Sequence, residues 1–334
     1  MPVGSRRQGR MMKGIVQRGF GEPSEVLTVT DVDTPEVVDD EVLVRVRAAS
    51  IHIGAVYGIR GYPKVMRLMF RSLLPKSGVV GTNIAGIVEA VGANVTELRP
   101  GDEVFGSAKG AFAEYAVAKA EALALVPDNL TLDQASAVGV SAFTALQGLR
   151  GRGDLQEGQK VLITGASGGV GTFAVQIAKA FGAEVTGVCS TRNLDMVRSI
   201  GADHVIDYTK EDFTEGGPKY DLIFDNVAAH SLKDMRRALT PDGLLLANGA
   251  PAPTGWFGGL GHPLKVALVS MFSKQQGSPF LSKESKEDLA TLRELTATGK
   301  IAPVIDQTFP FEKGIEAISS VGEGHNQGTS IITM

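Results

Sequence analysis

The chain has 334 residues, of which 43% are hydrophobic and 21% are charged, a composition that supports a sizeable core and about two domains. Its 33 basic and 37 acidic residues give a formal net charge of -4, and this balance argues against a nucleic-acid-binding protein, because phosphate contacts need a basic surplus. The sequence has no run of about 18 apolar residues, so it predicts no membrane span.

The cysteine content and the N-terminal segment bear on the cellular location of the protein. The single cysteine, Cys189, excludes an internal disulfide and a cysteine-rich zinc site. It favours a reducing, cytoplasmic location. Arginines occur in the segment 6–10, but no apolar segment follows them, so they do not begin a secretory signal. We expect residues 1–11 to form a flexible extension.

Residues 12–127 have the pattern of a small β domain. Val42, Val44 and Val46 alternate with more polar neighbours, which is typical of a half-buried strand. Further short strands are predicted, separated by Gly, Asn, Pro and Asp turns, over 86–91, 102–105 and 113–118. The expected result is a partly closed β-barrel.

From about residue 130 the pattern changes to alternating strands and helices. An apolar run at 161–164 precedes helical periodicity over 170–181, and the alternation continues with strands at 185–189, 205–207, 222–225 and 244–247. This order predicts a parallel, doubly wound sheet. The tail returns to β character and is expected to rejoin the first domain. The predicted division is therefore 12–127 with 299–334 for a discontinuous first domain, and 128–298 for the second.

The strongest local signal is the loop that follows the 161–164 strand. It contains Ala166-x-Gly168-x-x-Gly171, in which small residues allow a tight turn and let backbone N–H groups approach a pyrophosphate at a helix N-terminus. A strand before the loop and a helix after it give the context that a dinucleotide site requires, with a purely structural turn as the alternative. The residues predicted to contact the cofactor here are Gly165, Ala166, Ser167, Gly168, Gly169 and Val170.

The end of the second strand of this unit indicates which dinucleotide binds. An NAD-binding unit usually places Asp or Glu about 20 residues after the loop, to hold the ribose 2′-hydroxyl. This chain has Ser190, Thr191 and Arg192 there, and a guanidinium attracts a 2′-phosphate, so NADPH is favoured over NADH. The alternative for Arg192 is a solvated charge at a helix start. Tyr208, after the third strand, either caps the adenine-side phosphate or packs.

Several glycine-containing segments, together with this loop, resemble the medium-chain dehydrogenase/reductase superfamily, and in particular its zinc-independent quinone oxidoreductase (zeta-crystallin-like) branch. The segments are 81–86, 101–106, 110–115 and 201–208, and the resemblance covers nearly everything after Met12. It implies a GroES-like, partly closed β-barrel catalytic domain, a Rossmann doubly wound parallel-sheet domain that binds NADPH, and a homodimer.

The resemblance also bears on metal binding. Zinc alcohol dehydrogenases of this superfamily have a Cys ligand where this chain has His52, and a His-Glu pair where it has Thr82 and Asn83. Their third ligand has no counterpart here. A catalytic zinc needs three protein donors, so we predict no metal.

A metal-independent reductase favours an activated acceptor. Without a Lewis acid, hydride addition to a quinone, or to a C=C conjugated to a carbonyl, is easier than reduction of a simple ketone. The resemblance implies that Tyr57 occupies the position of a substrate-pocket tyrosine, able to orient a carbonyl or donate a proton. His52 stands where the branch has Asn and can donate a hydrogen bond, with a buried structural histidine as the alternative. Ala55 replaces the branch's Asp, which leaves the proton donor open.

The resemblance implies further contacts and leaves other functions open. The further cofactor-binding residues are Thr144, Asn226, Val227, Gly249 and Ala250, most of which follow strands of the second sheet. The segment 254–274 is expected to cover a substrate or a subunit partner, or to pack as a helix on its own domain. The alternative functions are an NADP-dependent ketone or alcohol oxidoreductase, and an NADPH-binding protein with little turnover.

Overall fold

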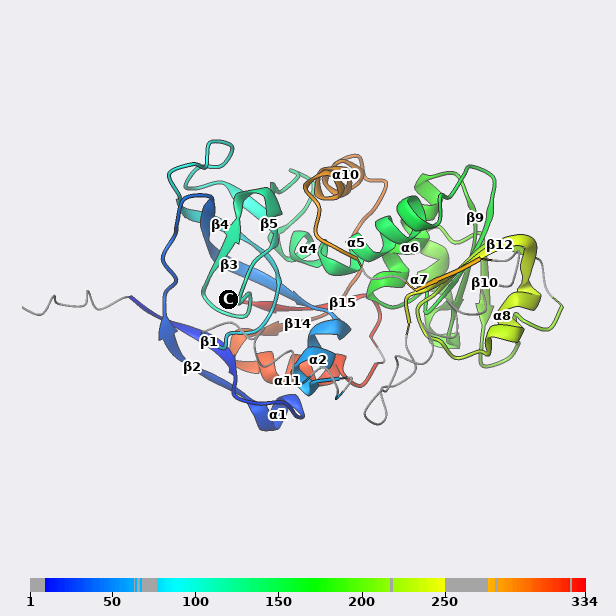
Figure 1. Cartoon of the computed structure of the whole chain (residues 1–334), viewed down its shortest axis with the longest axis horizontal. Helices are drawn as coiled ribbons and strands as arrows, with labels where there is room; N and C mark the ends of the chain where they lie inside the picture. The colour runs from blue at the N-terminus through cyan, green and yellow to red at the C-terminus, as the bar shows by residue number, and fades with distance from the viewer. Residues whose placement is uncertain are drawn as a thin grey trace, which may run out of the picture.

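The computed structural model describes residues 10–62, 64, 67, 77–216, 219–249, 276–279, 282–324 and 326–334, and these residues form two halves, each built on one main sheet (Figure 1). Within these ranges no helix is long and apolar enough to cross a bilayer. The 254–274 segment, Ala250 and most of the predicted extension lie outside the described residues. The β-structure begins at Met11, so this residue is a strand residue and not part of an extension.

The first half is a mostly antiparallel barrel-like sheet. Its strands follow the order β14-β15-β3-β4-β5-β7, with β6 also paired to β3, and β1 and β2 form a separate hairpin. The bounds are β1 (Met11–Gln17), β2 (Leu27–Asp33), β3 (Glu41–Ile51), β4 (Asn83–Val91), β5 (Glu103–Ser107), β6 (Tyr115–Lys119), β7 (Leu123–Leu125), β14 (Ile305–Pro310) and β15 (Thr329–Thr333). Val42, Val44 and Val46 are at most 1% exposed, which confirms the alternation predicted for this strand.

The C-terminal tail adds two strands to this sheet. β15 pairs antiparallel with β3, with Ser330 opposite Ile51, and β14 pairs parallel with β15. The pairing explains why the tail has β character although it follows the parallel sheet in the sequence. We retain the division into 12–127 with 299–334 and 128–298 as a proposal that these pairings support.

The second half is a parallel sheet with the strand order β10-β9-β8-β11-β12-β13. Its strands are β8 (Lys160–Thr164), β9 (Glu184–Cys189), β10 (His204–Asp207), β11 (Tyr220–Asp225), β12 (Leu239–Ala247) and β13 (Gln276–Pro279). The central strand β8 is buried along four of its five residues, as expected for a parallel strand covered on both faces. The order corresponds to 3-2-1-4-5-6, in which ligands bind where the order reverses, here between β8 and β11.

Short helices complete both halves and fill the space between them. They are α1 (Pro23–Val26), α2 (Ile53–Arg60), η2 (Ala120–Ala122), α4 (Leu132–Ala137), α5 (Val140–Leu146), η3 (Gln147–Arg152), α6 (Gly169–Ala180), η4 (Thr191–Asn193), α7 (Leu194–Ser199), α8 (Leu232–Ala238), α10 (Lys286–Ala297), η5 (Phe311–Lys313) and α11 (Gly314–Val321). Figure 1 shows α4, α5 and α10 between the two sheets. They lie where any ligand shared by the two halves must bind.

Direct contacts fix the two halves against each other. Phe105 of β5 belongs to the same buried cluster as Phe143 of α5 and Phe173 of α6. The side-chain amide of Gln176 exchanges two hydrogen bonds with the backbone of Ala302, at 2.7 and 3.0 Å. This continuous core holds the carboxyl edge of the parallel sheet beside the first domain.

Candidate functional site

The loop between β8 and α6 has the geometry of a phosphate cradle. Gly165 has a positive φ of 60°, and its carbonyl accepts a hydrogen bond of 3.0 Å from the Gly168 N–H, which closes a tight turn. A Cβ on Gly171 would overlap the Gly165 carbonyl oxygen, so only glycine permits this approach of helix and loop. The first N–H groups of α6 have no partners within the helix and are available to an anion.

The members of this loop divide into exposed and buried groups. Gly165, Gly168, Gly169 and Val170 are partly exposed, whereas Ala166 is fully buried and Ser167 is 9% exposed. The Asn193 amide donates to Ser167 Oγ at 2.8 Å, and the Gly328 N–H donates to the Ser167 carbonyl at 2.8 Å. Ala166 and the Ser167 side chain therefore hold the loop in place, and the four partly exposed residues form its accessible surface.

Asn193 and Gly328 were not predicted as site residues. Gly328 precedes β15 and has a φ of 88°, and a Cβ there would overlap the Val304 carbonyl oxygen. It therefore ties the end of the first domain to the loop of the second. No local sequence pattern predicts the contact between Ser167 and Gly328, because these residues lie 161 positions apart and meet only through the fold.

The end of β11 reaches the same crevice. The amide of Asn226 donates to the Thr164 carbonyl at 3.0 Å, and its oxygen accepts from Asn248 at 2.7 Å, so this side chain is used to connect neighbouring strand ends. Val227 is 48% exposed, and it lies against Gly165. Gly249 packs directly on the Asn226 backbone, where a Cβ would not fit. The exposed Val227 side chain is thus the apolar surface that these strand ends offer.

Thr144 lies on α5, at the junction between the halves. Its hydroxyl donates to the Val140 carbonyl at 2.7 Å and pairs with the Ser282 hydroxyl at 2.9 Å, and the residue is 6% exposed. The structure therefore engages Thr144 in bonds between α5 and the segment that leads to α10.

A carboxylate lies at the opposite end of the crevice, and it was not predicted as a site residue. Asp207, at the end of β10, accepts hydrogen bonds from the hydroxyls of Thr191 and Thr209, at 2.6 and 2.7 Å. The ammonium group of Lys210 lies 3.3 Å from its carboxylate. The Thr191 hydrogen bond, followed by those of Thr209, lowers the pKa of Asp207 to about 2. Hydroxyl groups and an ammonium group thereby stabilise the negative charge of Asp207.

Exposed side chains surround this carboxylate. Arg192 is exposed, Tyr208 is 60% exposed, and Ser190 is half-buried, all at the carboxyl ends of β9 and β10. Arg192 and Lys210 place two cations where a ribose 2′-phosphate would lie in a dinucleotide bound across this edge. The arrangement fits the phosphorylated cofactor in spite of Asp207.

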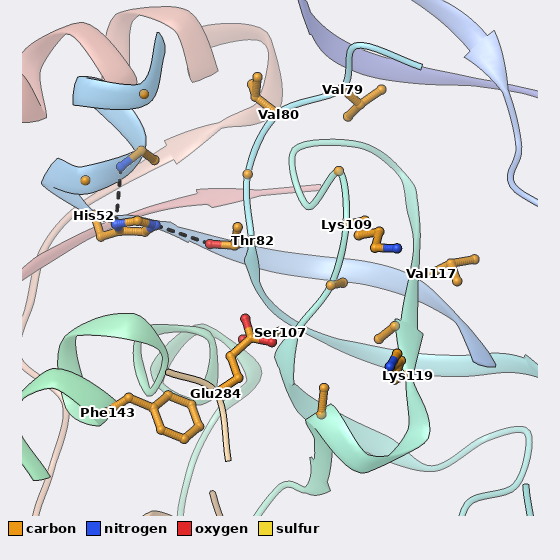
Figure 2. A pocket seen from close by; sticks show the side chains of 18 of the residues that line it. His52, Val79, Val80, Thr82, Ser107, Lys109, Val117, Lys119, Phe143 and Glu284 are labelled. Carbon is orange, nitrogen blue, oxygen red and sulfur yellow. Dashed lines mark hydrogen bonds between the residues drawn. The ribbon is translucent and has the colours of Figure 1, made fainter. Parts of the chain in front are cut away.

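A cavity of about 910 Å³ opens in the first domain and extends to the start of α10 (Figure 2). Its lining combines apolar, hydroxyl and imidazole groups with charged side chains, among them His52, Gly54, Ala55, Gly58, Val79, Val80, Thr82, Ser107, Lys109, Lys119, Phe143 and Glu284. Figure 2 shows His52 and Thr82 together on one side of the cavity, with Lys109 and Lys119 on the other. Phe143 of α5 lines the cavity, and Ser141 of the same helix lies beside Gly169 of the glycine loop, so this helix links the cavity to the dinucleotide crevice.

The ring of His52 is fixed by two hydrogen bonds. Nδ1 accepts from the Ala55 N–H at 3.2 Å, and His52 therefore acts as the N-cap of α2. Because Nδ1 accepts, the neutral ring carries its proton on Nε2, which lies 3.2 Å from Thr82 Oγ1. Burial lowers the pKa of His52 to about 4. The residue is a neutral hydrogen-bond donor to Thr82.

Tyr57 is not among the residues that line this cavity. It is half-buried on α2, and the cavity is lined by Gly54, Ala55 and Gly58 of the same helix. At about 100° per residue, the lining residues Gly54, Ala55, Gly58 and Ile59 occupy one side of the helix, and Tyr57 lies about 130° from the centre of that side. The structure thus brings His52, and not Tyr57, to the cavity wall.

We predict that His52 remains neutral through the physiological pH range. Its folded pKa of about 4 lies below the 6.5 of an ordinary histidine, so the unfolded chain takes up a proton first, and the free energy of unfolding falls as pH drops from 6.5 to about 4. Relative to His52→Asn, which keeps a capping acceptor, the wild type should lose roughly 1–3 kcal/mol over this interval. Urea unfolding at several pH values measures this loss, and an NMR midpoint for His52 near its ordinary value would contradict it.

The parallel sheet with its glycine loop, joined to a barrel domain with a cavity, defines the class of a two-domain dinucleotide-dependent oxidoreductase. Residues 38–128 match the family model of the alcohol dehydrogenase GroES-like domain, and residues 200–332 match the model described as zinc-binding dehydrogenase. The chain is 31% identical over 342 residues to a chloroplastic quinone-oxidoreductase homolog of Spinacia oleracea, covering 97% of this chain and 98% of that protein.

Two further relatives agree with this class. An NADPH-dependent alkenal/one oxidoreductase of Arabidopsis thaliana is 29% identical, over 96% of this chain and 79% of that protein. The solved quinone oxidoreductase of Coxiella burnetii is 26% identical with a TM-score of 0.84, covering 97% of this chain and all of that chain. The chain belongs to the medium-chain dehydrogenase/reductase superfamily, in its quinone oxidoreductase branch.

The donor set at the cavity does not fit a zinc ion, although one family description names that metal. His52 uses both ring nitrogens, and its neighbours Thr82 and Asn83 offer a hydroxyl and an amide instead of the Cys, His or carboxylate ligands that zinc prefers. Among the described residues, no group of three His, Cys, Asp or Glu side chains is arranged to hold a metal. We derive no step through a metal.

Proposed function

We propose that the protein is an NADPH-dependent oxidoreductase that transfers hydride to a quinone or to the C=C of an α,β-unsaturated carbonyl compound. The observation that carries this proposal is the joining, through α5, of a dinucleotide crevice to a cavity in whose wall a neutral His52 is hydrogen-bonded to Thr82. Such a cavity suits an acceptor that is already activated. The names of the spinach and Arabidopsis relatives support the same chemistry.

The residues of the crevice fit NADPH. The partly exposed backbone of Gly165, Gly168, Gly169 and Val170 would hold the pyrophosphate, and Val227 would offer an apolar surface beside it. The exposed strand ends would hold the phosphorylated ribose and the adenine through Ser190, Thr191, Arg192 and Tyr208. When bound, NADPH supplies the hydride, and the protein positions the acceptor.

The size of the cavity indicates the class of acceptor. A volume of about 910 Å³ lies at the upper end of the roughly 300–1,000 Å³ that drug-sized ligands occupy. We therefore expect quinones and ring-bearing enones to have a higher kcat/KM than three-carbon alkenals, because small acceptors leave most of the apolar lining unused. A comparison of 4-phenyl-3-buten-2-one with acrolein measures this preference, and equal values would contradict it.

Nucleotide consumption tests the proposed activity. We expect oxidation of NADPH, and much less of NADH, with a naphthoquinone or an aryl enone in the presence of a chelator. Turnover of a saturated ketone alone would favour the alternative ketone or alcohol oxidoreductase. NADPH binding without turnover of any acceptor would favour a binding protein. The presence of Ala55, where the branch has an Asp, supports this alternative.

The location and the assembly also belong to this proposal. We propose a cytoplasmic homodimer, on the basis of the single cysteine and of the family resemblance. Light scattering of the purified protein tests the assembly, and a monomer mass would contradict it. The names of the spinach and Arabidopsis relatives both include the word chloroplastic, so cell fractionation is the corresponding test of the location.

A further inference from the structure

The hydroxyl of Thr82 lies in the cavity wall, and its proton has only a weak acceptor. Thr82 Oγ1 accepts from His52 Nε2, so its own hydrogen must point elsewhere. Among the described residues, the acceptor within reach is Asn83 Oδ1, at 3.4 Å, beyond the usual range for a hydroxyl donor. Asn83 Oδ1 already accepts from the Val140 N–H at 3.3 Å. A ligand oxygen in the cavity can therefore accept a hydrogen bond from the Thr82 hydroxyl, and only the weak contact with Asn83 Oδ1 is given up.

The other uncharged groups near Thr82 are less suitable donors, and Lys109 and Lys119 lie on the opposite side of the cavity (Figure 2). His52 is occupied by Ala55 and Thr82, and it holds its proton toward Thr82. Ser107 is 6% exposed, and its Oγ is itself buried, without a hydrogen-bond partner among the described residues. Tyr57 is not part of the cavity lining. Thr82 is half-buried in the wall, next to the His52 ring (Figure 2).

We propose that the Thr82 hydroxyl donates the hydrogen bond that binds the carbonyl oxygen of the acceptor, and that His52 orients Thr82 for this role. The proposal rests on the proposed function. When hydride forms a C–H bond at the β-carbon of an enone, the C=C π pair forms a new double bond between the α-carbon and the carbonyl carbon. The C=O π pair moves to the oxygen, which becomes the negatively charged oxygen of an enolate. The Thr82 hydrogen bond stabilises this charge, while Thr82 keeps its proton.

Reduction is completed at the α-carbon. A proton from water forms the second C–H bond there, so one hydride and one proton together convert the C=C into a single bond. With a quinone, the added hydride gives the hydroquinone monoanion, and the same hydrogen bond stabilises its anionic oxygen until a proton from water completes the hydroquinone. The His52 N–H, by donating to Thr82 Oγ1, polarises the hydroxyl and strengthens the hydrogen bond to the acceptor.

The test compares Thr82→Val, which keeps the shape, with Thr82→Ser, which keeps the hydroxyl. For 4-phenyl-3-buten-2-one we expect kcat/KM to fall about 100-fold in Thr82→Val and to stay within about fivefold of wild type in Thr82→Ser. The Kd for NADPH, measured by fluorescence, should be unchanged in both variants. Thr308→Val makes the same substitution at an exposed position of β14 outside the cavity lining, and as the matched control its kcat/KM should stay within about threefold.

Two readouts separate this role from a structural one. With a para-substituted series of this enone, the rate in Thr82→Val should depend more steeply on electron withdrawal, because the substrate must then stabilise the charge alone. His52→Leu should lower kcat/KM about tenfold, and it should have little further effect in the Thr82→Val background. Equal activity of Thr82→Val and wild type, or an unchanged dependence on electron withdrawal, would overturn the role of Thr82. Absence of wild-type turnover with every acceptor would instead overturn the proposed function.

Discussion

Gly168→Ala is expected to leave the fold intact while weakening NADPH binding about 10- to 100-fold, the equivalent of one hydrogen bond to a charged group. Gly168 is the N-cap of α6 with a φ of -84°, which alanine adopts readily. An added Cβ would meet only the Gly165 carbonyl oxygen, at 3.5 Å, and would otherwise extend into the space assigned to the pyrophosphate.

Two other glycine variants make this result interpretable. Gly171→Ala places its methyl against the backbone of Gly165 and Ala166, so it should lower the free energy of unfolding by roughly 1–3 kcal/mol as well as nucleotide affinity. Gly151→Ala, in an exposed helical position with no atom near the added methyl, should change neither property for the worse. Thermal melting and fluorescence titration measure both properties. Tight NADPH binding by Gly168→Ala would contradict the location of the pyrophosphate.

Arg192→Ala is expected to weaken NADPH about 10- to 100-fold and NADH by no more than about threefold, because only NADPH has a 2′-phosphate to pair with the guanidinium. The nearby Asp207 makes this cation more important, since its carboxylate would otherwise repel the phosphate. Asp207 is held by Thr191, Thr209 and Lys210, and Arg192 is exposed next to Thr191 at the same strand end.

The matched control for charge is Arg198→Ala. Arg198 is exposed on α7 and pairs with Asp195 at 3.1 Å, within the same turn. Its removal should affect the two nucleotides equally and slightly. Calorimetric titration with NADPH and NADH gives both Kd values for each variant. Equal losses of the two nucleotides in Arg192→Ala would contradict the assignment of the 2′-phosphate.

The periodicity of apolar residues predicted strands of this fold because the burial pattern of a strand is visible in its own sequence. The run at 161–164 corresponds to β8, which is buried on both faces, and the alternation of Val42, Val44 and Val46 corresponds to the inner face of β3. The glycine loop could be predicted for a similar reason, since its spacing requires a strand before it and a helix after it. The prediction did not separate Ala166, which is buried, from the residues that face the crevice.

The contacts between side chains depend on pairings that the sequence does not display. Ser50 lies opposite Asn83 in the antiparallel register of β3 and β4, and this pairing brings His52 next to Thr82. Asp207 reaches Thr191 because β10 lies beside β9. The absence of Tyr57 from the cavity wall, by contrast, follows from helical phase once Ala55 and Ile59, as well as Gly54 and Gly58, are known to line the cavity.

Hydride transfer to carbon is the central claim, and its most direct test is the fate of a label. The protein is incubated with 4-phenyl-3-buten-2-one and NADPH that carries deuterium at both C4 positions, and the product is analysed by NMR. We predict the saturated ketone with one deuterium at the β-carbon and a solvent-derived hydrogen at the α-carbon. An allylic alcohol with deuterium at the carbinol carbon, or no transfer of deuterium by protein that binds NADPH, would contradict the account.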